Sequence, residues 1–104
     1  MTTFLLTYRA PDNYTRGTAE GRAAWMAWFE SMGGALVDYG KPVARSAALG
    51  DCGAGGRAVD GYSLIGADDL DAALALAKGC PFVGMGGGVE VSALTELPTV
   101  PDPA

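Results

Sequence analysis

Histidine is absent from this chain of 104 residues, and its absence narrows the chemistry that the protein can perform. Histidine is the commonest protein ligand of metals and the usual proton carrier near neutral pH. The two cysteines, Cys52 and Cys80, lie in different contexts and form no CxxC motif. We therefore expect no cofactor and no zinc or iron site of the usual ligand types, and histidine-dependent catalysis is excluded.

Basic residues and long apolar runs are also scarce. Seven lysines and arginines are scattered among twelve acidic residues, which gives a net charge of −5. Surfaces that bind nucleic acids or anionic membranes need clustered positive charge. The longest apolar runs, near Phe4 and Ala72, are too short to span a bilayer, and the N-terminus lacks the basic segment of a signal peptide. We expect a cytoplasmic protein that binds neither nucleic acid nor membranes.

The length and the hydrophobic periodicity predict one α+β domain over residues 1–97, followed by an extended, proline-rich tail over 98–104. Helices are predicted from the N-cap Thr18 to about Met32, and from the N-cap Asp68 to Lys78, where Gly79 and Pro81 end the second helix. Alternating apolar residues predict strands at 3–8, 35–39, 58–65 and 89–94, and a weaker strand at 43–49 that a flexible loop over 50–56 joins to the next strand.

Both helices carry an apolar stripe at i, i+3, i+4, i+7 spacing, which is typical of a face packed on a core. The first stripe is predicted to form the main core, although its two tryptophans could instead roof a pocket for a flat ligand; it comprises Trp25, Trp28, Phe29 and Met32. The second stripe is rich in alanine and should lie close to a sheet; it comprises Leu70, Ala73, Leu74 and Ala77.

The order of these elements is that of the ferredoxin-like, or split β-α-β, fold, in which an antiparallel sheet carries two helices on one face. The other face of the predicted sheet also carries Leu, Val, Ala and Tyr side chains. Exposure of such a face would leave a large apolar patch, so we expect a homodimer that pairs two sheets and forms a dimeric α/β barrel. The polar loop over 9–17 is long enough to act as a flap over a neighbouring cleft.

Four segments together resemble the YCII-related family, specifically its branch described by a D-G-P-F motif: FLLTY, AWMAWFESMGGALVDYG, DGYSLIGADDLDAALALAKGCPF and GGGVEVSAL. The resemblance covers about residues 3–94. It implies a fold similar to the dimeric α/β barrels, which include muconolactone isomerases and cofactor-independent monooxygenases. Most members of the family have no assigned activity, so the resemblance implies the fold, the dimer and a pocket more than a reaction.

The chain departs from the family pattern where chemistry would be expected. The stretch SAALGDCGAGGRAVDG stands in the place of the D-G-P-F motif, and Cys80-Pro81-Phe82 stands where another branch has D-P-aromatic. That branch is proposed to use a His-Asp pair, which a chain without histidine cannot supply. The resemblance therefore implies a pocket without its usual base.

Asp38 and Asp60 are the weak candidates for a general acid or base, because an apolar cleft raises the pKa of a carboxyl group. The alternative is that Asp38 caps a turn and that Asp60 pairs with Arg57 or Arg45. Cys80 follows a helix C-terminus, which disfavours its thiolate, and Cys52 has no activating base. The candidates for lining a ligand pocket are Tyr8, Trp25, Trp28, Tyr62 and Arg45.

Three functions remain open at this point. The first is a dimeric small-molecule-binding or accessory domain, which fits the missing histidine and the absence of metal ligands. The second is a cofactor-independent isomerase, cyclase or oxygenase that acts on a small aromatic or lactone-like substrate. The third is a protein-interaction module linked to transcriptional regulation, for which an apolar patch left exposed after dimerisation would be the sign.

Overall fold

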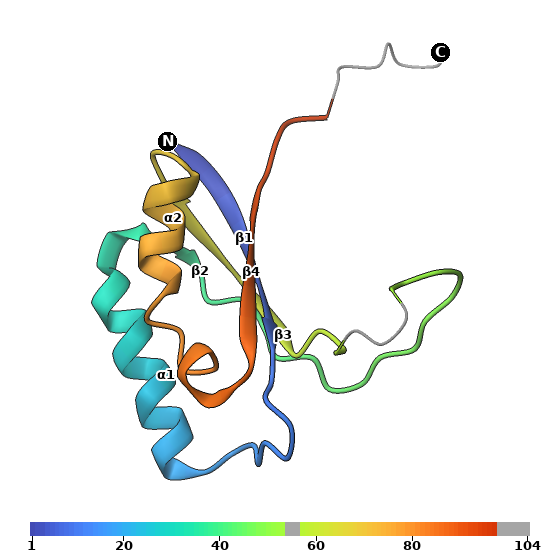
Figure 1. The fold of residues 1–104 in the computed structure, drawn as a ribbon. Helices are drawn as coiled ribbons and strands as arrows, with labels where there is room; N and C mark the ends of the chain where they lie inside the picture. Colours follow the sequence, from blue (N-terminus) through green and yellow to red (C-terminus); the bar gives the residue numbers. More distant parts are fainter. Residues whose placement is uncertain (54–56, 98–104) are drawn as a thin grey trace.

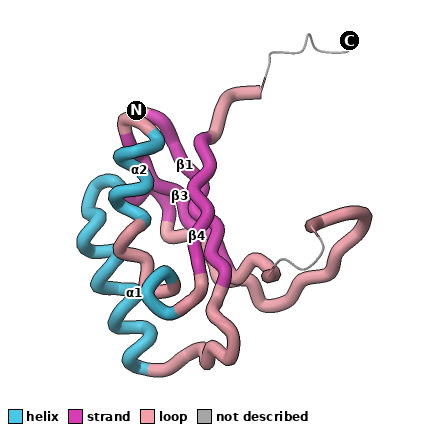
Figure 2. The backbone as a smooth tube through the Cα atoms, viewed as in Figure 1, coloured by secondary structure: helices cyan, strands magenta, loops and turns pink. Residues whose placement is uncertain are grey.

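A computed structural model describes residues 1–53 and 57–97 of the chain. The described residues form four strands, two α-helices and two short 3-10 helices, which are coloured along the chain in Figure 1 and by type in Figure 2. Their order is β1 (Thr2–Arg9), α1 (Ala19–Met32), η1 (Gly33–Ala35), β2 (Leu36–Asp38), β3 (Gly61–Ala67), α2 (Leu70–Ala77), η2 (Val83–Met85) and β4 (Gly88–Ala93).

The strands form one sheet in the order β2-β3-β1-β4, and every neighbouring pair is antiparallel. Both helices lie on the same face of this sheet (Figure 1). This arrangement confirms the predicted α+β fold of the ferredoxin-like type. Strand β1 is central, lies between β3 and β4, and pairs with β3 from Thr2 opposite Ala67 to Tyr8 opposite Gly61.

Helix α1 has the predicted bounds because its start and its end are both specified locally. The Thr18 side chain accepts a hydrogen bond from the Gly21 amide at 3.0 Å, and Glu20 lies in the first turn. Gly33 follows the last turn with φ of +53°, a value that favours glycine and stops the helix.

The predicted boundary between β3 and α2 is wrong by one to two residues. Pairing with β1 extends β3 to Ala67 instead of Ile65, because Thr2 and Thr3 continue the ladder. The N-cap of α2 is then Asp69 rather than Asp68, and its carboxylate accepts a hydrogen bond from the Ala72 amide at 2.8 Å.

Residues 43–49 form no strand, which corrects the sequence prediction. The antiparallel hairpin with β3 ends at the bridge between Pro42 and Gly61 and at the bond from the Val43 amide to the Asp60 carbonyl oxygen, 2.8 Å long. From Ala44 to Ala48 the side chains are small or polar and have no apolar face to bury, so nothing holds a further strand. Residues 43–53, here termed the arm, instead extend away from the sheet on the side opposite the helices (Figure 1, green).

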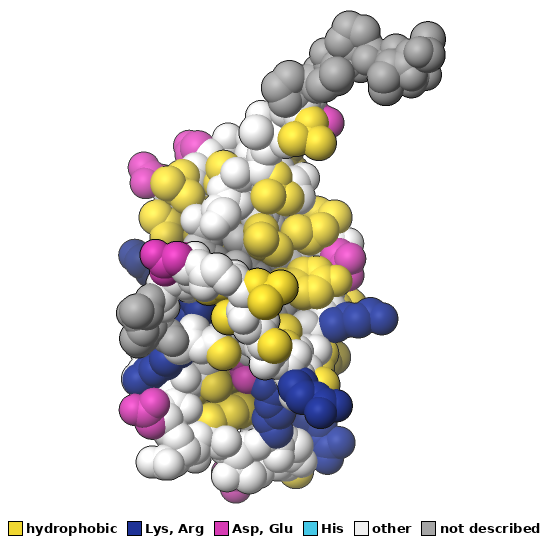
Figure 3. Space-filling model, turned by 90° about the vertical axis from the view of Figure 1, so that its right-hand side faces the viewer, with side chains coloured by type: hydrophobic (Ala, Val, Ile, Leu, Met, Phe, Trp, Pro, Cys, Tyr) yellow, Lys and Arg dark blue, Asp and Glu magenta, His cyan; other side chains and the backbone are white. Residues whose placement is uncertain are grey.

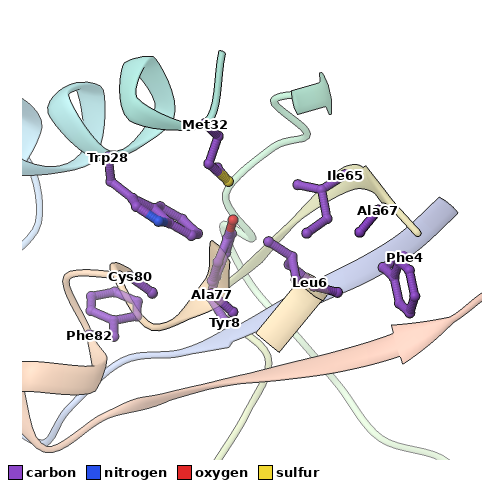
Figure 4. Packing of buried hydrophobic residues seen from close by; sticks show 11 residues of the cluster. Phe4, Leu6, Tyr8, Trp28, Met32, Ile65, Ala67, Ala77, Cys80 and Phe82 are labelled. Atoms are coloured by element: carbon purple, nitrogen blue, oxygen red, sulfur yellow. The ribbon is translucent and has the colours of Figure 1, made fainter. Parts of the chain in front are cut away.

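The main core fills the space between the helices and the inner face of the sheet (Figure 4). It consists of Phe4, Leu6, Tyr8, Trp28, Met32, Ile65, Ala67, Ala73, Ala77, Cys80 and Phe82. Trp28 and Met32 are the buried members of the predicted α1 stripe, whereas Trp25 and Phe29 are half-buried.

The stripe predicted for α2 is half wrong. Ala73 and Ala77 are buried, but Leu70 and Leu74 are 49% and 44% exposed, and Leu76 packs on the core in their place. The alanines let α2 approach the sheet closely, which turns the two larger leucines outwards.

Two further predictions concern membrane-spanning helices and the C-terminal tail. No helix in the described part of the chain is long and apolar enough to cross a membrane. The predicted tail over 98–104 lies outside the described residues, as does part of the loop over 50–56.

Candidate functional site

A cavity of about 380 Å³ lies between the first half of α1, the loop that joins β1 to α1, and the start of β3. This volume is in the range of small-molecule sites. Helix α1 provides one wall through Gly21, Arg22, Trp25, Met26 and Phe29. The opposite wall comes from residues 39–42 and 60–62, and the loop after β1 contributes Tyr14, Arg16 and Gly17.

Aromatic residues dominate the lining. Seven of the nine aromatic residues in the chain line this cavity, namely all four tyrosines, Trp25, Phe29 and Phe82. Several of these rings meet edge to face: the centroid of Trp25 lies 4.8 Å from that of Tyr8 and 4.9 Å from that of Phe82. Such contacts add to the burial energy and fix the ring positions, so the wall is largely preformed.

Tyr62 differs from the other aromatic lining residues in its orientation. It pairs with Thr7 on β1, and strand alternation places its side chain on the outer face of the sheet, which is the face opposite the helices. The side chain is 38% exposed there. Tyr62 therefore borders both the cavity and the outer face.

Tyr8 presents its ring to the site but not its hydroxyl group. The hydroxyl group is buried and points toward α1, near Met32 (Figure 4), and has no hydrogen-bond partner among the described residues. Burial raises the pKa of Tyr8, against a smaller opposing effect of the Ser63 side chain. The Ser63 hydroxyl group donates its own proton to the Tyr39 carbonyl oxygen at 2.6 Å. The Tyr8 phenol therefore stays neutral and does not reach a ligand.

Four charged side chains line the cavity, and three of them are cationic: Arg16, Arg22, Lys41 and Asp60. Arg16 forms an ion pair with Asp60, which joins the loop after β1 to the start of β3. Arg22 and Lys41 form no ion pair with any residue that the structure describes. The cavity mouth therefore carries positive charge that protein carboxylates do not neutralise.

The loop after β1 is anchored at several points. The Arg57 guanidinium lies 3.4 Å from the Asp12 carboxylate and donates to the Gly86 carbonyl oxygen at 2.8 Å. Arg9 in turn donates to the Arg57 carbonyl oxygen and pairs with Glu90. These contacts hold the loop, which was predicted to be a flap, with Tyr14 and Arg16 at the cavity.

Residues 39–42 form their wall by close contact with β3. The Tyr62 amide donates to the Lys41 carbonyl oxygen at 3.2 Å. Gly40 has φ of +71°, and a Cβ atom placed there would lie 1.8 Å from the Tyr62 carbonyl oxygen. Only glycine allows the two backbones to approach this closely.

Only some of the residues that the sequence suggested for the pocket line the cavity. Tyr8, Trp25 and Tyr62 line the cavity. Trp28 does not, because it is buried between the helices, where its indole nitrogen donates to the Leu76 carbonyl oxygen at 3.0 Å. Arg45 does not either, because it lies in the exposed arm.

The two candidate carboxylates have the structural roles that were considered as the alternative. Asp38 accepts a hydrogen bond from the Gly40 amide at 2.8 Å and so caps the turn after β2. Asp60 is ion-paired, but with Arg16 instead of the expected Arg57 or Arg45. Asp60 nevertheless lines the cavity, whereas Asp38 does not.

Sequence reasoning missed seven aromatic or charged residues of the site: Tyr14, Arg16, Arg22, Phe29, Tyr39, Lys41 and Phe82. Two of them lie in the loop that was predicted to cover a cleft, and this was the signal that could have identified them. The others come from a helix face and from two turns, and their proximity depends on how the strands pair.

Neither cysteine belongs to the lining, and the two differ in access. Cys80 is buried, and burial raises the pKa of its thiol, which opposes thiolate formation in the same direction as predicted. Cys52 is exposed in the arm. Among the described residues, no three side chains of His, Cys, Asp or Glu group together in a way that could hold a metal ion.

No protein-family model matches the chain, and comparisons with curated proteins and with solved structures give no match either. The resemblance to the YCII-related family therefore stays a prediction from the sequence.

Proposed function

We propose that this protein binds a small molecule in the aromatic cavity and does so as a homodimer that pairs the outer faces of two sheets. The observation that supports binding is the lining itself. Seven aromatic residues surround about 380 Å³ of space, with a few charged groups at the mouth. Apolar cavities with a few polar groups are the usual form of small-molecule sites.

The dimer proposal rests on the outer face of the sheet. Apolar side chains from β1, β2 and β3 and from the segments next to the strands lie on it: Met1, Leu5, Val37, Tyr62, Leu64 and Leu94. Figure 3 shows hydrophobic side chains gathered over the upper and central part of this side of the molecule, with basic side chains toward its lower edge. A contiguous apolar patch of this kind is typical of an interface.

The arm favours a second copy of the chain as the partner. It extends on the outer side of the sheet (Figure 1), and every residue from Ala44 to Gly53 is exposed. Leu49 at its tip is 95% exposed. In a two-fold dimer of facing sheets, the arm of each copy would lie beside the other copy and could bury this leucine.

Measurement of the mass in solution by light scattering tests the dimer. The native chain is expected at twice the mass of 10.6 kDa, and Leu94→Arg, which places a charge on the outer face, should shift the protein to the monomer. Leu74→Arg is the matched control, because Leu74 is 44% exposed and Leu94 45%, but Leu74 lies on α2. A native monomer, or equal effects of the two variants, would contradict the dimer.

Ligand-observed NMR with a set of small aromatic fragments tests binding. Met26→Trp should abolish the fragment signals, because Met26 lines the cavity and is 48% exposed, so a larger side chain can fill the site with little loss of stability. Ala27→Trp is the control, because Ala27 is exposed on the same helix and lies outside the lining. Binding that survives Met26→Trp would place the site elsewhere, and a chain that binds no fragment would refute the proposal.

The proposal includes membership of the YCII-related family and a cytoplasmic location, which the two free thiols support. It does not extend to catalysis. Both candidate carboxylates have protein partners, since Asp38 caps a turn and Asp60 is held by Arg16.

A further inference from the structure

The charge at the cavity has the opposite sign to the charge of the whole chain. The chain has a net charge of −5, yet the residues that line the cavity include three cations and a single carboxylate. Three of the seven basic residues in the sequence are therefore gathered at one site. A local field of this kind selects the charge of what enters.

Two of the three cations remain for a ligand. The Arg16 guanidinium is paired with Asp60. Arg22 lies on the helix wall and Lys41 on the opposite wall, and both are exposed and have no carboxylate partner among the described residues. The aromatic rings lie deeper, since Tyr8 and Phe82 are buried and Trp25 is half-buried.

From this arrangement we infer that the ligand is a flat aromatic or similarly apolar molecule with one anionic group, a carboxylate in the simplest case. Its apolar body lies against Trp25 and Phe82, and its anionic group lies at the mouth between Arg22 and Lys41. This inference rests on the proposed binding function and adds the chemical class of the ligand. It is compatible with the prediction that the chain binds no nucleic acid, because two cations suit a small anion and not a polyanion.

Three naphthalene probes of similar size and different charge provide the test: 2-naphthoate, 2-naphthylmethanol and 2-naphthylmethylamine. Isothermal titration calorimetry should show that 2-naphthoate binds about tenfold more tightly than the neutral alcohol, and that the amine binds most weakly. The preference should shrink when the salt concentration is raised from 0.15 to 1 M, because the Debye length falls from about 8 to 3 Å.

Two variants test whether Arg22 and Lys41 cause the preference for the anionic probe. Arg22→Gln and Lys41→Gln should each lower the affinity for 2-naphthoate severalfold and leave the affinity for the alcohol unchanged, since the aromatic wall is intact. Arg45→Gln is the control: it removes the same charge from the chain, but Arg45 lies in the arm and outside the lining. Its affinity for 2-naphthoate should equal that of the native protein.

The outcomes separate this inference from the proposed function. If the alcohol binds as tightly as 2-naphthoate, the site is a small-molecule site without charge selection, and only the inference is overturned. An equal loss of 2-naphthoate affinity in Arg45→Gln would also overturn it, because the preference would then follow the net charge of the chain. If none of the three probes binds, both the inference and the binding proposal are overturned.

Discussion

Substitution of Gly40 by alanine should be the most damaging small change in the cavity wall. Gly40 has φ of +71°, and an added Cβ atom would lie 1.8 Å from the Tyr62 carbonyl oxygen and 3.1 Å from the Ser63 Cα atom. Both of these atoms belong to the backbone of β3, so no side-chain rotation can relieve the clash. Residues 39–42 would have to move away from β3.

The cost follows from the contacts that this movement breaks. The bonds from the Tyr62 amide to Lys41 and from the Ser63 hydroxyl group to Tyr39 contribute about 1 kcal/mol each. Overpacking adds about 1–3 kcal/mol, and the positive φ adds about 1 kcal/mol for alanine. We expect Gly40→Ala to lower the free energy of unfolding by at least about 3 kcal/mol.

Gly50→Ala is a matched control that isolates the effect of the close packing between residues 39–42 and β3. Gly50 has φ of +70°, almost the same as Gly40, but no atom lies within 4 Å of an added Cβ atom. Both variants remove the same conformational freedom from the unfolded chain, so that effect cancels in the comparison. Urea unfolding followed by tryptophan fluorescence should give a difference of about 3–5 kcal/mol. Losses within about 0.5 kcal/mol of each other would refute the packing of residues 39–42 on β3.

Three further outcomes are expected. Tyr8→Phe should leave the free energy of unfolding unchanged or raise it by up to about 1 kcal/mol, because the buried hydroxyl group has no hydrogen-bond partner among the described residues. A decrease of about 1 kcal/mol would instead show that the Tyr8 hydroxyl group donates a hydrogen bond to Ser63. Burial raises the pKa of Cys80, so as pH rises the thiol ionises first in the unfolded chain, at a pKa of about 8.5. The free energy of unfolding, measured with urea, should therefore fall as pH rises above that value. Cys80→Ala should make this fall less steep. A thiol reagent added to the folded protein should label Cys52 at once and Cys80 only on unfolding; rapid labelling of both would contradict the burial of Cys80.

The fold was predictable from the sequence because its signals are local. Thr18 and Gly33 fix the ends of α1 by side-chain capping and by a positive φ. Alternation along β1 places Phe4 and Leu6 on the buried face, and the order of elements then leaves few ways to pair the strands. The errors occur where tertiary contacts decide, as in the extension of β3 by pairing with β1.

The choice of buried face on α2 shows the same limit more clearly. Periodicity alone groups Leu70 with Leu74 as well as with Ala73 and Ala77, since all four fall within one broad stripe. Close approach to the sheet selects the alanines, and the larger leucines remain exposed at 49% and 44%. A sequence pattern gives the spacing of a stripe but not the distance between the layers that decides its centre.

The cationic lining of the cavity is a feature that reasoning from composition missed. Basic residues that are scattered in the sequence predicted that the chain binds neither nucleic acid nor anionic membranes, since such partners need clustered positive charge. Pairing of β1 with β3 brings the loop after β1 beside the turn after β2, so that Arg16, Arg22 and Lys41 line one cavity. Their separation in sequence carried no information about their distance in space. The net charge of a chain thus argues against large charged partners, whereas the charge of a small ligand depends on residues that only the fold brings together.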